Sequence, residues 1–153
     1  MLAELSFTKA SYFKGSIDVD LDQLKFPRTL RKLVLNERFI TLNWEPPQSP
    51  RELSLLNIYF HNGFNVKLPP DLFYLHTADT NLFDLDNVQF PTGLRDLTMW
   101  HNYSMRSMLN TNLKELTQLV SFFVMENISL TEFDTPNDKL RCKSRYWNNG
   151  ASN

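Results

Sequence analysis

The chain has 153 residues and a net charge of −1, and 42% of its residues are hydrophobic. This length supports one domain, or a short repeat array, with a core of its own. The near-neutral charge provides no global field for nucleic acid or an anionic membrane, and four glycines with eight prolines are too few for a disordered or collagen-like chain.

Cysteine content and the first residues bear on the compartment. The single cysteine, Cys142, excludes an internal disulfide framework and a cysteine-cluster zinc site. The stretch from Met1 to Gly15 lacks a basic segment followed by a continuous apolar run, so we expect no signal peptide. No window is apolar for long enough to span a membrane. These observations predict an intracellular protein whose compartment is unknown.

Short runs of alternating apolar residues recur along the chain in the pattern L-x-x-L-x-L. In chain order the runs begin at Leu2, Leu30, Pro50, Leu72, Leu94, Leu119 and Leu140. The steps between these starts are 28, 20, 22, 22, 25 and 21 residues. A proline shortly before most runs stops helix, and the alternation that follows is typical of a half-buried strand. The sequence therefore predicts six to seven irregular repeats with one short strand each, the first and last being weak.

The segments between the strands are expected to return the chain mostly through turns or extended backbone. The return from Met105 to Leu119 is longer than the others, and Thr111 or Asn112 could cap a helix there. Four apolar residues in or next to this return are spaced as on one helical face: Leu109, Leu113, Leu116 and Val120. We therefore expect a short helix in this return.

The pattern resembles the leucine-rich repeat, whose copies of 20–29 residues follow L-x-x-L-x-L-x-x-N. The copies Leu94–Asn102 and Leu119–Asn127 both end in the asparagine that the family uses to bond neighbouring backbone. The leading "LPPDL" (Leu68–Leu72) and "FPTGL" (Phe90–Leu94) are similar to the family's short, proline-containing subtype. Four copies depart from the pattern and hold other residues at the asparagine position: Ala10, Arg38, Ile58 and Thr80.

The resemblance implies an α/β fold class: a β-rich, right-handed leucine-rich-repeat solenoid. It also implies one parallel strand per repeat on the concave face, with turns, extended backbone or a short helix on the convex face. Residues 1–153 would form a single array, which is either whole or part of a longer one. The alternative is an ordinary α/β or all-β domain whose leucine spacing is a coincidence.

The residues between the apolar positions should form the exposed face of the sheet. This face changes from charged in the early repeats to aromatic in the later ones. Five residues are expected to lie together at the aromatic end: Tyr74, His76, Trp100, Phe123 and Met125. An exposed apolar patch usually marks a binding surface, so we expect these residues to bind a protein or peptide partner. Two alternatives stay open: a register slip that buries Trp100 and exposes Met99, and an exposed face without function.

No pattern for catalysis, a cofactor or a metal ion is found, so the chain is predicted not to be an enzyme. The histidines His61, His76 and His101 lack zinc-ligand spacing, and His61 and His101 are expected in turns after strands. The basic stretch Lys139–Arg145, followed by two aromatic residues, is weak evidence for nucleic acid.

The sequence thus favours a non-enzymatic module for protein–protein recognition. The alternatives are the substrate-recognition part of a larger enzyme, such as a ubiquitin ligase, and a degenerate structural repeat protein with no specific partner. Neither end resembles the polar cap that a repeat array needs. The array therefore either continues in a longer protein or has its ends covered by a partner or by self-association.

Overall fold

The computed structural model of the chain describes residues 3–8, 19–41, 43–64, 67–134, 136 and 145–147. Its elements, in chain order, are β1 (Glu4–Thr8), β2 (Val19–Asp20), η1 (Leu21–Gln23), β3 (Lys32–Thr41), β4 (Glu52–Phe60), β5 (Tyr74–Ala78), β6 (Asp96–Trp100), β7 (Ser107–Met108), η2 (Leu113–Glu115), β8 (Ser121–Met125), β9 (Glu132–Phe133) and β10 (Arg145–Trp147). The two η elements are single turns of 3-10 helix, and no α-helix occurs in these ranges.

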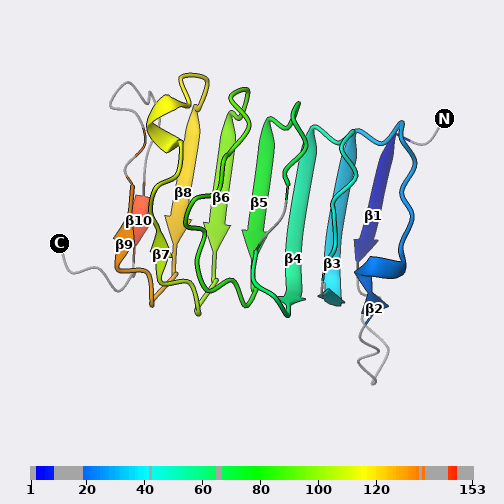
Figure 1. The fold of residues 1–153 in the computed structure, drawn as a ribbon, viewed down its shortest axis with the longest axis horizontal. Coiled ribbons are helices and arrows are strands. Elements are labelled where there is room, and N and C mark those ends of the chain that lie inside the picture. Colours follow the sequence, from blue (N-terminus) through cyan, green and yellow to red (C-terminus); the bar gives the residue numbers. More distant parts are fainter. Residues whose placement is uncertain are drawn as a thin grey trace.

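β7 and β9 pair as a small parallel sheet of their own, and the other strands form one eight-stranded parallel sheet. Seven of them lie side by side in the order β1-β3-β4-β5-β6-β8-β10, and β2 pairs with the later part of β3 (Figure 1). The first residues of six neighbouring strands are paired in one row: Glu4, Lys32, Glu52, Tyr74, Asp96 and Ser121. Successive members of this row are 28, 20, 22, 22 and 25 residues apart, as predicted. The fold is therefore a parallel β-solenoid with almost no helix.

The register of the last repeat differs by one residue from the prediction. Phe123 pairs with Arg145 and Val124 with Tyr146, which is a step of 22 residues. A repeat that starts at Leu140 requires a step of 21 and would place Arg145 opposite Val124. The predicted apolar positions there hold Lys143 and Arg145, so hydrophobic alternation does not define the register of this strand.

The core lies on the side of the sheet to which the leucine positions point. In β3, β4, β6 and β8 these residues are at most 1% exposed: Leu33, Leu35, Leu53, Leu55, Leu97, Met99, Phe122 and Val124. Thr77 takes the equivalent position in β5 and is also 1% exposed. In β1, Leu5 and Phe7 are only partly buried, because this strand pairs on one side alone within the described residues.

The return segments are less helical than predicted. The expected helix near residue 113 is the single turn η2, and the Asn112 side chain forms no capping bond to it. Instead, the Asn112 amide bonds the backbone N–H and C=O of Phe90 in the preceding repeat, both at 2.8 Å. Val120, which was expected on the buried face of that helix, is 53% exposed. The competing bonds to Phe90 hold the chain in a turn, so the helical spacing of the leucines does not become a helix.

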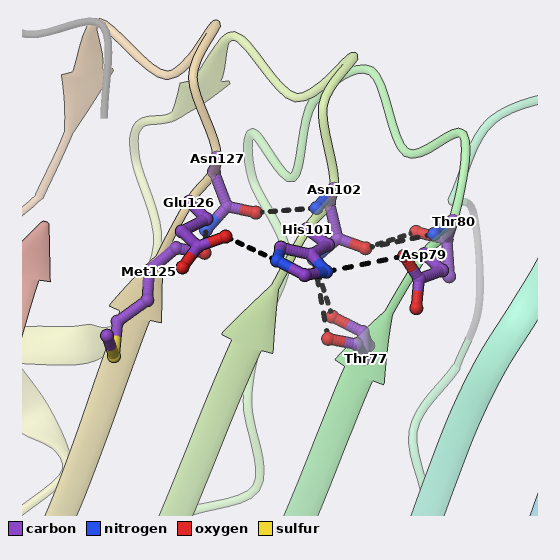
Figure 2. A network of polar contacts seen from close by, with 8 residues as sticks. All are labelled: Thr77, Asp79, Thr80, His101, Asn102, Met125, Glu126 and Asn127. Atoms are coloured by element: carbon purple, nitrogen blue, oxygen red, sulfur yellow. Dashed lines mark hydrogen bonds and ion pairs between the residues drawn. The ribbon is translucent and has the colours of Figure 1, made fainter. Parts of the chain in front are cut away.

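Two buried asparagines join the last full repeats, as the family pattern implied (Figure 2). Asn127 accepts the backbone N–H of Asn102 at 2.9 Å and donates to the carbonyls of Met99 and Met125, both at 3.0 Å. Asn102 in turn accepts the Thr80 hydroxyl at 2.6 Å. Both asparagines are 0% exposed, and these bonds satisfy backbone groups that the turn after each strand leaves unpaired.

Candidate functional site

The aromatic end of the exposed sheet surface is the candidate site. We name as the outer face the strand residues that alternate with the core positions. Its two central rows are Val34, Ser54, His76, Thr98 and Phe123, and Asn36, Leu56, Ala78, Trp100 and Met125. Strands β5, β6 and β8 lie side by side (Figure 1). Their paired residues bring together Tyr74, His76, Trp100, Phe123 and Met125.

The exposure of two adjacent residues decides between the two registers that the sequence left open. Met99 is 1% exposed, whereas Trp100 is 44% exposed. The slipped register, in which Trp100 enters the core, is therefore wrong. Because a shift by one residue exchanges the two faces of a strand, the same observation places Phe123 and Met125 on the outer face.

Trp100 is more exposed than the other four residues of the candidate site. It is the only exposed large apolar residue among the five, since Tyr74, His76, Phe123 and Met125 are each partly buried. Its row partner Ala78 is 4% exposed and lies between Trp100 and Leu56, both of which have larger side chains.

Charged residues occupy the row where the strands begin. Lys32 and Glu52 form an ion pair at 3.1 Å, and the hydrogen bond that Lys32 donates to the Glu52 carboxylate raises the pKa of Lys32. Tyr74 lies between Glu52 and Asp96 in the same row. Burial raises the pKa of the Tyr74 hydroxyl, and both carboxylates raise it further. Tyr74 therefore keeps its proton at neutral pH and presents a hydrogen-bond donor at the edge of the apolar surface.

His76 is an uncharged member of the site. Burial lowers the pKa of its imidazole, and Asp79 offsets this effect only in part. Its Nε2 atom is buried without a hydrogen-bond partner among the described residues, and Tyr74 packs edge-on against its ring at 6.4 Å between centroids. Both observations favour the neutral imidazole, which behaves here as an aromatic residue.

We expect the His76→Gln variant to lose part of the acid sensitivity of the fold. A histidine with a lowered pKa takes up its proton first in the unfolded chain, so its stabilising effect is full above about pH 6.5 and declines below it. The free energy of unfolding should therefore fall less between about pH 8 and about pH 5.5 in the variant than in the wild type. Urea unfolding at several pH values measures this, with Thr98→Ala as the non-titrating neighbour; equal pH slopes for all three proteins would contradict the assignment.

His101 follows β6 and connects three repeats at the rim where the strands end (Figure 2). Its Nε2 contacts the carboxylate of Glu126 at ion-pair distance, and its Nδ1 lies 3.5 Å from the carboxylate of Asp79. The imidazole also packs against Trp100, with 4.3 Å between centroids, and is stacked on Tyr103 at 5.4 Å. Two carboxylates therefore hold the His101 ring in place, and this ring packs against the Trp100 indole.

The turn position of His101 was predicted, but its two carboxylate partners were not. His101, Asp79 and Glu126 each directly follow the last strand residue of their repeat, and all three have positive φ angles, of 55°, 52° and 54°. Asn57 holds the same position after the row residue Leu56, with φ of 57°. Aligning the residue after each strand could have revealed this row, since left-handed backbone favours Asn and Asp.

A pocket of about 290 Å³ lies beside His101, between neighbouring turns. Its lining includes Asn57, Tyr59, Asp79, His101 and Tyr103. The described ranges contain no group of three or more His, Cys, Asp or Glu side chains placed to hold a metal ion. Cys142 and most of the basic tail that was considered for nucleic acid lie outside the described residues.

Comparison with known proteins found no match: neither a family model, nor a curated protein, nor a solved structure is significantly similar to this chain. In the described part of the chain, no helix has the length and apolar character needed to cross a bilayer.

Proposed function

We propose that the chain is a leucine-rich-repeat protein that recognises a protein or peptide partner through the outer face, without catalysis. The repeat pattern, the parallel pairing of strands from successive repeats and the buried pair Asn102 and Asn127 support this family. Right-handed winding, a concave outer face and an intracellular location are part of the proposal. A solenoid of this kind offers an extended surface to which several repeats contribute side chains.

The exposed indole of Trp100 is the observation on which the proposal rests. Trp is the residue most often found as an energetic anchor in interfaces, and 44% of this one is exposed on a rigid strand. Phe123 and Met125 on β8 extend the apolar surface on one side. Tyr74 adds a hydroxyl donor at its edge. A partner would bury an apolar side chain against Trp100 and accept a hydrogen bond from Tyr74.

We expect the double variant Trp100→Ala/Phe123→Ala to fold but to bind its partner at least ~10-fold more weakly, because truncating interface anchors costs about 2 kcal/mol or more. Peptides are first selected from a displayed library against the immobilised wild type. Their dissociation constants are then measured for both proteins by fluorescence anisotropy, after circular dichroism has shown that both are folded.

The matched control is Phe83→Ala/Ile128→Ala, which removes two exposed apolar residues from return segments and not from the outer face. Phe83 is 49% exposed and Ile128 is 56% exposed, so the control also removes two large apolar side chains from the surface. Selected peptides should bind this control as they bind the wild type. If both double variants lose the peptides equally, or if the Trp100/Phe123 variant keeps them, the outer face is not the recognition surface.

A further inference from the structure

A second candidate site lies at the opposite rim, where the strands begin. One residue just before each strand is held by a backbone hydrogen bond to its equivalent in the preceding repeat. The row is Arg31, Arg51, Phe73, Arg95 and Val120, with N···O distances of 2.7, 2.9, 2.8 and 2.7 Å. Adjacent strands are about 4.8 Å apart, so the backbones of Arg51 and Arg95 are about 10 Å apart. The backbone of Phe73 lies midway between them.

These three residues line a pocket of about 520 Å³. Phe73 is half-buried and the two arginines are exposed. Tight turns of two successive repeats complete the lining, with Pro70 and Asp71 from one and with Thr92 and Gly93 from the other. Each turn follows a proline and is closed by a backbone hydrogen bond, from Leu72 to Pro69 at 3.2 Å and from Leu94 to Pro91 at 2.9 Å. Equivalent backbone turns of two successive repeats therefore shape this pocket.

The charges of this pocket are only partly balanced. Neither Arg51 nor Arg95 forms an ion pair with a described residue, although Lys32 elsewhere in the molecule does. Asp71 is the one carboxylate of the lining, so the pocket carries an excess of one positive charge. A guanidinium group is a planar fork of donors that fits carboxylate and phosphate oxygens, and an aromatic ring offers a surface for stacking.

We propose that the pocket formed by Arg51, Phe73 and Arg95 binds an oxyanion, a carboxylate or a phosphate, carried on a flat apolar group that packs on Phe73. The two arginines, which lie on opposite sides of Phe73, reach the anion from opposite sides, and Thr92 supplies an uncharged donor. This site does not depend on recognition by the outer face, since it shares none of the five residues proposed there.

Three small probes that share one ring test the proposal: phenyl phosphate, phenylacetate and the neutral benzyl alcohol. Each is titrated into ¹⁵N-labelled protein at low ionic strength, and the amide signals of Phe73 and Gly93 are followed by NMR. We expect saturable shifts with at least one anion, with a dissociation constant in the millimolar range, and none with the alcohol. Tighter binding of phenyl phosphate identifies phosphate as the natural group, and tighter binding of phenylacetate identifies carboxylate.

The variants Arg51→Gln and Arg95→Gln should each weaken anion binding at least ~10-fold, because each removes one charged donor fork. Arg31→Gln is the matched control: it removes the same charge from the same row, one strand outside the pocket, and should leave the affinity unchanged. Equal effects of all three variants would mean a general charge effect, and equal binding of the alcohol would mean that the anion is not recognised. Either result, or no saturable binding of any probe, overturns the proposal.

Discussion

Replacing Phe122 by Ala should destabilise the protein by about 3–5 kcal/mol, whereas the same change at the next residue, Phe123, should cost about 1 kcal/mol. Phe122 is 0% exposed and packs in the core behind β8, so its removal leaves a cavity among leucines of the neighbouring repeats. Phe123 is only partly buried on the outer face. Urea unfolding followed by circular dichroism measures both values.

This pair of substitutions tests the central geometrical feature of the fold. The two residues have the same side chain and adjacent positions, so helix or strand propensity changes equally in both variants. Only the side of the sheet differs. Equal loss of stability in the two variants would contradict the assignment of Phe122 to the core and Phe123 to the surface. A larger loss for Phe123→Ala would support the slipped register that the structure excludes.

The Asn127→Ala variant should lose about 3 kcal/mol of stability, although it removes no apolar group from the core. The substitution leaves the Asn102 N–H and the Met99 carbonyl without the partners that Asn127 provides, and each buried polar group left unpaired costs about 1–3 kcal/mol. Hydrogen exchange of the Asn102 amide should accelerate in the variant, because the acceptor of that N–H is lost.

Asn36→Ala is the matched control for this prediction. Asn36 is exposed at the end of the outer-face row on β3, so its loss should change the free energy of unfolding by about 0.5 kcal/mol or less. A comparable loss of stability in the two variants would show that the bonds between Asn127 and its neighbours do not hold the repeats together.

The predictions from sequence succeeded where the pattern within one repeat was sufficient to define the structure. The alternation of Leu97 and Met99 with Thr98 and Trp100 requires only that one face of a strand be buried, and the structure has that arrangement. Where they failed, the alternation was weak or a distant residue intervened. The last repeat has polar residues at its apolar positions, and the helix predicted at Leu113 is limited to one turn where Asn112 bonds Phe90.

The sequence by itself determined the repeat spacing and the short strand at the start of each full repeat, because these follow from a period-two pattern within one copy. The side to which each strand residue points stayed open by one residue until the burial of Met99 and the exposure of Trp100 decided it. The sequence also indicated Asn102 and Asn127 as the residues that link copies. Only the tertiary structure decided that His101 lies between Asp79 and Glu126, and that Phe73 lies between two arginines. Those contacts join residues more than 20 positions apart, and they arise because stacking brings equivalent positions of successive repeats about 4.8 Å from one another.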